Sequence, residues 1–178
     1  MLKNTTESYG LVSRLVHWLV FILFVLVVIG GQRAEDMANG PEKLSIINQH
    51  KSVGTVILIL MLFRLVWRVT NPRPVSLAPD AKNARIAALV QMALFILMLA
   101  QPLAGILMSQ TAGYPVSLFG AFTLPTLVGE SESLHELFEG VHKALWVAIA
   151  ALVLAHAAGA IKQHVIFKNR TLMRMIKG

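Results

Sequence analysis

Four long apolar segments dominate this sequence and limit the folds open to it. They cover residues 13–31, 46–67, 84–108 and 140–162. Each is close to the length of about 20 residues that an α-helix needs to cross the hydrocarbon core of a bilayer. Hydrophobic residues make up 56% of the chain and charged residues only 14%, which excludes an ordinary soluble domain. The sequence therefore predicts an all-α integral membrane protein, with one domain over residues 1–178 and a bundle of four transmembrane helices.

A cleavable signal peptide is the alternative for the first apolar segment, because Lys3 precedes it. The apolar run from Leu15 to Gly31 is longer than the usual core of a signal peptide, and it contains His17 and Trp18. We therefore expect this segment to be a permanent transmembrane helix.

Positive charge is divided unevenly between the two sides that four spans create. One side carries only Arg33, Lys43, Lys51 and Lys143, whereas the other twelve Lys and Arg residues lie on the opposite side. The positive-inside rule then places both termini and the 68–83 loop in the cytoplasm, and the 109–139 connection outside. The net charge of +7 follows from this topology, so nucleic-acid binding is not needed to explain it.

Histidines lie at matching depths in three of the predicted spans. His142 and His156 are fourteen residues apart, so their rings leave nearly the same face of the fourth helix, about 21 Å apart along its axis. An ionisable side chain within a membrane costs free energy unless it has a partner. His17, at the cytoplasmic end of the first span, matches the depth of His156, and His50, at the outer end of the second, matches His142.

Two transverse histidine pairs favour two haem sites. Neutral imidazole is a standard axial ligand of haem iron, and helix bundles build such sites from facing helices. A zinc site or a proton relay would normally recruit thiols or carboxylates, but the chain has no Cys and its spans have no Asp or Glu until their outer ends. Three small residues offer room for a flat macrocycle: Gly54, Gly105 and Gly159. A non-redox metal transporter or scaffold that uses the same histidines is the alternative.

His135 lies seven residues before His142 and would share its face if the fourth helix extended outward. Its neighbours include four glutamates, which mark an aqueous amphipathic turn: Glu130, Glu132, Glu136 and Glu139. We therefore expect His135 to be a surface residue.

Several motifs add a resemblance that covers nearly the whole chain. They are "SRLVHWLV", "QHKSVGTVILILMLFRLVWRVTNPRP", "QPLAGILMSQTAGYPVSLFG", "VHKALWVAIAALVLAHAAGAIKQH" and "LMRM". Together they resemble the bacterial cytochrome b561 family of four-helix, di-haem membrane proteins. The resemblance implies two b-type haems, one held by His17 and His156 and the other by His50 and His142, in agreement with the depths of these residues.

The resemblance also implies a function at the bacterial inner membrane. Members of this family oxidise superoxide and pass the electron to ubiquinone, so a superoxide:quinone oxidoreductase is the activity we favour. An electron-transfer partner of a periplasmic protein, without superoxide activity, is the alternative. Cations beside the outer histidines are candidates for steering the anion or for contacting haem propionates: Arg33, Lys51 and Lys143.

One position departs from the family pattern. Relatives often have two adjacent histidines at the end of the fourth helix, where this chain has Gln163 followed by His164. Gln163 shares the face of His156, whereas His164 is turned about 80° away from it. Both are candidate quinone contacts, but an amide at residue 163 can only hydrogen-bond a quinone carbonyl and cannot supply a proton as imidazole does.

Overall fold

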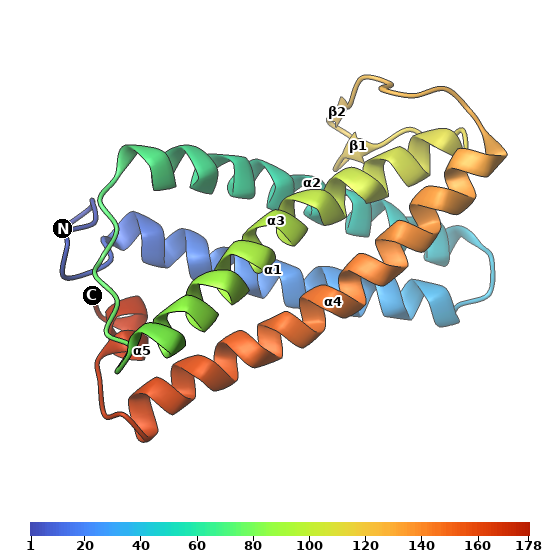
Figure 1. Ribbon diagram of the computed structural model, residues 1–178. Coiled ribbons are helices and arrows are strands. Elements are labelled where there is room, and N and C mark those ends of the chain that lie inside the picture. Colours follow the sequence, from blue (N-terminus) through green and yellow to red (C-terminus); the bar gives the residue numbers. More distant parts are fainter.

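The computed structural model describes residues 1–178 and contains four long helices (Figure 1). These are α1 (Leu11–Asp36), α2 (Pro41–Thr70), α3 (Ala81–Thr111) and α4 (Glu132–Val165), and the smaller elements are β1 (Ser117–Leu118), β2 (Phe122–Thr123) and α5 (Thr171–Ile176). All four long helices are long and apolar enough to cross a membrane. The prediction of an all-α protein with four transmembrane helices is confirmed, and each helix extends past its predicted span at both ends.

Polar residues outside the apolar spans cap the starts of α3 and α4. The Asp80 carboxylate accepts a hydrogen bond from the Asn83 backbone N–H at 2.8 Å, and Ser131 accepts one from the Leu134 N–H at 3.4 Å. These are N-cap contacts, which satisfy backbone donors in the first helical turn. Hydrogen bonds from the Asn83 backbone and side chain also hold the pKa of Asp80 below its usual value. Hydropathy alone gave shorter helices because it does not record such caps.

The helices pack in chain order, α1 on α2, α2 on α3 and α3 on α4. Both termini and α5 lie at one end of the bundle, here called the terminal end, and β1 and β2 lie at the opposite end, here called the hairpin end (Figure 1). Midway between them is a core layer with side chains from all four helices: Val20, Ile57, Met61, Met98 and Ile149. Ile149 of α4 is completely inaccessible to solvent.

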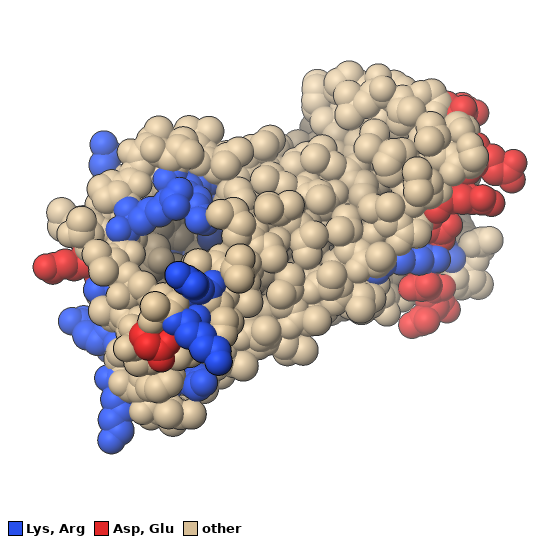
Figure 2. Space-filling view, in the orientation of Figure 1, with Lys and Arg blue, Asp and Glu red and all other residues tan.

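The outer surface of the bundle is apolar between its two ends. Figure 2 shows basic side chains at the terminal end, acidic side chains concentrated at the hairpin end, and a wide uncharged band between them on this face. Large hydrophobic side chains such as Leu26, Val66 and Leu154 are more than half exposed within the helices. An apolar band flanked by charge is what a bilayer solvates, so the protein is a multi-pass membrane protein.

Ser52 anchors the β1–β2 hairpin to α2. Its hydroxyl accepts a hydrogen bond from the Phe119 backbone N–H at 2.9 Å and lies 3.0 Å from the carbonyl oxygen of Ser117, to which it can donate. Phe119 occupies the turn in the left-handed region, with φ 49°. The sequence predicted only a connection here. Ser52 of α2 orders it against the bundle together with Gln110 of α3, which donates to the Pro125 carbonyl and accepts from the Leu127 N–H.

The chain after α4 returns to the terminal end and covers it. The Trp18 indole N–H donates to the Met175 carbonyl at 3.0 Å, and Arg14 donates to the Ile176 carbonyl at 3.1 Å. Arg174 reaches the Val75 carbonyl in the loop between α2 and α3 at 2.7 Å. The C-terminal segment is therefore part of the folded bundle, whereas the sequence predicted only that this terminus is cytoplasmic.

Replacing Ser52 with Ala should release the hairpin from α2. The variant leaves the Phe119 N–H without its acceptor, a loss that typically costs about 1–3 kcal/mol for a buried donor. Hydrogen exchange of the amides in residues 117–123 should be faster than in the unmodified protein, with little change in α1. Ser45→Ala is the matched control, because Ser45 is an exposed serine on the same helix. Equal exchange rates in both variants would contradict this role of Ser52.

Candidate functional site

One face of α4 carries a polar or buried residue at every seventh position. These residues are His135, His142, Ile149, His156 and Gln163. Seven residues are close to two helical turns, so the five side chains form a stripe along the helix. Ile149 is fully buried and the other four are half-buried. The stripe therefore faces the bundle interior and presents imidazoles on both sides of the core layer.

The structure brings the predicted histidine partners together. His17 of α1 and His156 of α4 face each other at the terminal end with ring centroids 6.2 Å apart and planes inclined by 58°. His50 of α2 and His142 of α4 do the same at the hairpin end, also at 6.2 Å, with planes inclined by 69°. Both pairs join helices that are not neighbours in the packing order, so side chains bridge α4 to α1 and α2 at two depths.

The spacing within each pair suits a metal ion held between two imidazoles. Two metal–nitrogen bonds of about 2 Å on opposite sides of one ion separate the two nitrogens by about 4 Å. The distance from the bonded nitrogen to the centre of its own ring, counted once for each imidazole, accounts for most of what is left of the 6.2 Å between centroids. Neither pair is joined by a third His, Cys, Asp or Glu into a cluster. The donor set therefore fits an ion that takes two axial protein ligands, as haem iron does, better than a tetrahedral zinc ion.

Backbone carbonyls orient both imidazoles at the hairpin end. His50 Nδ1 lies 2.9 Å from the Val27 carbonyl oxygen, and His142 Nδ1 lies 3.1 Å from the Gln101 carbonyl oxygen. Since a carbonyl can only accept, Nδ1 carries the proton in each ring and the Nε2 lone pair is available to a metal. These carbonyls could not be predicted from the sequence, because residue type does not show which backbone acceptor on another helix a side chain will contact.

Two glycines make these carbonyl contacts sterically possible. Gly31 lies four residues after Val27, and a Cβ there would be 3.0 Å from His50 Cε1. Gly105 lies four residues after Gln101, and its Cβ would be 2.9 Å from His142 Cε1. Both distances are shorter than an ordinary carbon–carbon contact. The sequence-based interpretation assigned Gly105 to the approach of a macrocycle, but the His142 ring itself lies against it. A Cβ at Gly54 or Gly159 would meet nothing within 4 Å.

A cavity of about 510 Å³ opens around the hairpin-end pair. Its lining includes both imidazoles, the core-layer residues Ile57 and Met98, and Gln101 of α3. The Gln101 amide donates to His142 Nε2 at 3.2 Å, while its own Oε1 is buried without a hydrogen-bond partner. Buried polar atoms are normally satisfied, so Gln101 Oε1 is a polar atom beside His142 that the protein itself leaves without a partner.

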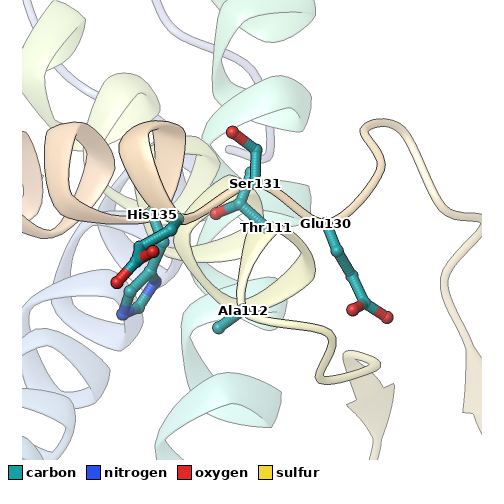
Figure 3. A pocket seen from close by; sticks show the side chains of 6 residues that line it. Thr111, Ala112, Glu130, Ser131 and His135 are labelled. Carbon is teal, nitrogen blue, oxygen red and sulfur yellow. The ribbon is translucent and has the colours of Figure 1, made fainter.

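His135 does not lie freely on the surface as predicted from its acidic neighbours. Its Nδ1 lies 3.0 Å from the Met108 carbonyl oxygen, and the ring lines the hairpin-end cavity. His142 makes the same contact with the Gln101 carbonyl. His135 lies seven residues before His142 on α4, and Met108 lies seven residues after Gln101 on α3. In Figure 3 the His135 ring and the Glu130 carboxylate lie on opposite sides of Thr111 and Ala112, so these two residues do not form a common metal site.

The three predicted hairpin-end cations differ in their environments. Arg33 pairs with Glu42 at 3.8 Å and does not line the cavity. Lys143 lines the cavity but pairs with Glu139 at 2.7 Å. Lys51 also lines the cavity and has no carboxylate partner. Its Nζ lies instead over the Tyr114 ring, 5.5 Å from the centroid. Lys51 is therefore the cation of the three whose charge is least neutralised.

The predicted quinone contacts also differ from each other. The Gln163 Oε1 accepts a hydrogen bond from the Asn169 side-chain amide at 2.5 Å, and the same amide donates to the Leu77 carbonyl at 3.0 Å. Gln163 therefore helps to hold the chain after α4 against the loop between α2 and α3. The His164 side chain is exposed and has no hydrogen-bond partner in the protein.

Comparison with known proteins gives consistent matches over this architecture. Residues 8–178 match the family model described as Prokaryotic cytochrome b561. The chain is 31% identical to cytochrome b561 homolog 2 of Escherichia coli K12, over 97% of this chain and 93% of that protein. It is 29% identical to cytochrome b561 homolog 1 of the same organism, over 90% and 92% of the two chains. It is also 25% identical to a probable superoxide oxidase CybB of Yersinia pestis, over 96% of each chain.

A methyl group at Gly105 should displace the His142 ring. The Gly105→Ala variant introduces a Cβ 2.9 Å from His142 Cε1, so we expect the bond from Nδ1 to the Gln101 carbonyl to lengthen or break. In protein labelled with ¹⁵N-histidine, the resonances of one imidazole should shift while those of His17 and His156 stay in place. Gly159→Ala is the control, because its Cβ lies in open space. Identical spectra for the two variants would show that Gly105 does not position the ring.

Proposed function

The chain belongs to the prokaryotic cytochrome b561 family, and we propose that it is a di-haem b-type cytochrome that carries electrons across a bacterial inner membrane. The family and the four apolar helices establish membrane electron transfer by a multi-pass protein. One observation supports the finer proposal: two histidine pairs, each with ring centroids 6.2 Å apart, lie on opposite sides of an apolar core layer.

The four histidines of these pairs would be the axial ligands, with His50 and His142 at one site and His17 and His156 at the other. Haem supplies one-electron chemistry when it is bound, and the chain supplies ligation, spacing and electrostatics. At the hairpin end, hydrogen bonds from Nδ1 to carbonyls make the Nε2 ligands more basic. The terminal-end rings have no such acceptor. Because more basic ligands favour ferric iron, this asymmetry supports electron flow from the hairpin end to the terminal end.

Charge supports a cytoplasmic location for the terminal end. Twelve of the sixteen Lys and Arg residues belong to the termini, to the loop between α2 and α3, or to the helix ends beside them. Acidic side chains concentrate at the hairpin end (Figure 2). By the positive-inside rule the hairpin end is periplasmic, and the proposed electron flow is then from the periplasm toward the cytoplasmic side.

Superoxide is the periplasmic donor that we propose, and one relative is named a probable superoxide oxidase. The hairpin end as a whole is acidic, so an anion would be attracted only locally. Lys51 gives such a local charge, because it lines the cavity beside His50 without a carboxylate partner. A cation at the mouth of a low-dielectric cavity raises the encounter rate of a small anion.

Ubiquinone is the acceptor that we propose, with Gln163 and His164 as its candidate contacts. Gln163 belongs to the α4 stripe and lies two turns beyond His156, so it is close to the terminal-end pair. Its amide group is held by Asn169. A quinone carbonyl would have to accept from the Gln163 amide N–H, while the exposed His164 imidazole is the one of the two side chains that can supply a proton.

Single replacements should remove the two haems separately. The unmodified protein should contain two b-type haems per chain in a pyridine haemochrome assay. His50→Ala and His156→Ala should each reduce this to about one, because each variant removes an axial ligand from one pair only. His135→Ala is the control and should keep both haems, since His135 belongs to neither pair.

Two results of this assay would contradict the proposal. If both single variants kept two haems, the assignment of the ligands would be wrong. If the folded, haem-supplied unmodified protein contained none, the redox function would fail, and a metal transporter or scaffold that uses the same histidines would take its place.

Removal of the Lys51 charge should slow reduction by superoxide. In stopped-flow experiments with the purified oxidised protein, Lys51→Gln should lower the second-order rate constant several-fold and weaken its dependence on ionic strength. Lys143→Gln should have a smaller effect, because Glu139 already neutralises Lys143. If superoxide does not reduce the unmodified protein rapidly, the donor is another species, and a periplasmic redox protein becomes the better candidate.

A further inference from the structure

Arg64 is a half-buried arginine on α2 that has no acidic partner. The two ion pairs of the protein, Arg33 with Glu42 and Lys143 with Glu139, are both at the hairpin end. Arg64 makes no side-chain hydrogen bond to another residue and is half-buried. It lies near the imidazoles of both His17 and His156. A positive charge thus lies beside the terminal-end pair without compensation from the protein.

The position of Arg64 on α2 directs it toward the bundle interior. Met61 precedes it by three residues and Ile57 by seven, so the three side chains share one face of the helix. Met61 is 2% exposed and Ile57 is 4% exposed, and both belong to the core layer. Arg64 therefore continues the core-facing side of α2 toward the terminal end, whereas a cation that served only the lipid interface would lie on the outer face.

No carboxylate of the chain is available to neutralise Arg64. Seven of the nine belong to segments at the hairpin end: Glu35, Asp36, Glu42, Glu130, Glu132, Glu136 and Glu139. Asp80 caps α3 through Asn83, and Glu7 is exposed in the N-terminal segment. An uncompensated charge within a membrane bundle is costly. An anion that balances Arg64 would therefore come from outside the polypeptide.

The neighbouring arginines are already engaged, which distinguishes Arg64 from them. Arg68 lies one turn further along α2, with its guanidinium carbon 5.6 Å from the centroid of the Phe95 ring. Arg14 donates to the Ile176 carbonyl in the chain segment that covers the terminal end. Figure 2 shows basic side chains bordering a hollow at this end of the molecule. Arg14 keeps one buried nitrogen, Nε, without a partner, but Arg64 is the arginine of these three that has neither a side-chain hydrogen bond nor an aromatic contact within the protein.

We propose that Arg64 binds a carboxylate, namely a propionate of the haem held by His17 and His156. The inference rests on the proposed di-haem function. A guanidinium presents paired N–H donors that match a carboxylate, and such charge-assisted pairs are stronger than neutral hydrogen bonds. The phosphate of an anionic lipid has related chemistry, but Arg64 lies on the core-facing side of α2, next to the imidazoles. Arg64 thus positions the haem and places a positive charge near its iron.

Redox titration of Arg64 variants tests this assignment. Arg64→Gln should lower the midpoint potential of one of the two haems, because removing a nearby positive charge favours ferric iron, and should lower the content of that haem. Arg64→Lys should retain most of the potential, since it keeps the charge. Arg85→Gln, which removes an exposed arginine from α3 at the same end, should leave both potentials unchanged. The propionate bending band in the resonance Raman spectrum should shift in both Arg64 variants, because lysine lacks the paired N–H donors of a guanidinium, and should stay in place in Arg85→Gln.

The remaining outcomes separate the alternatives. Unchanged potentials and Raman bands in Arg64→Gln, with less phospholipid phosphorus bound per chain, would overturn the assignment and identify a lipid phosphate as the anion. If the potentials, the Raman bands and the bound phospholipid phosphorus are all unchanged in Arg64→Gln, the propionate assignment is wrong and no other anion is identified. If Arg64→Gln does not fold, an unaltered Raman band in Arg64→Lys would also count against it. Absence of haem from the unmodified protein would instead refute the di-haem function on which the inference depends.

Discussion

The cost of placing a polar group in hydrocarbon is the constraint on which this structure depends. Lipid tails are as apolar as leucine side chains, so burial of apolar surface does little to choose between alternative packings of four helices in a membrane. Polar groups with few available partners are more selective. His50 and His142 each find a carbonyl on another helix, and His17 faces His156. His142 and His156 thereby connect α4 to α3 and α1 at two defined depths, and His50 connects α2 to α1.

The sequence was sufficient to predict the features that follow from composition and depth. Apolar length predicted four helices, and the heights of the histidines along those helices predicted which rings would face each other. Hydropathy does not specify how a helix is rotated about its axis or what a backbone carbonyl contacts. The roles of Val27, Gln101 and Gly31 were missed for this reason. His135 was misjudged because nearby glutamates suggested water, whereas its ring turns inward to the Met108 carbonyl.

Short polar contacts in the connections were also beyond prediction, because they join residues far apart in the chain. Ser52 holds Phe119 across 67 positions, and Trp18 reaches Met175 across 157. Each contact consists of a single hydrogen bond between residue types that occur throughout the sequence. A buried charge without a partner in the protein says more about function than these single hydrogen bonds do, because its energetic cost requires a counterion. Arg64 was counted for topology in the sequence, and only its packing in the structure raises the question of its counterion.

The core layer of Val20, Ile57, Met61, Met98 and Ile149 has a consequence for the energy stored across the membrane. It separates the two histidine pairs with apolar side chains alone, and Ile149 leaves no surface accessible to water at its position. An ion or a hydrated proton would need a chain of polar groups to pass, because hydrocarbon solvates charge poorly. Electrons do not need such a chain. The layer therefore acts as an electrical filter, which admits redox current and prevents that current from becoming an ion leak.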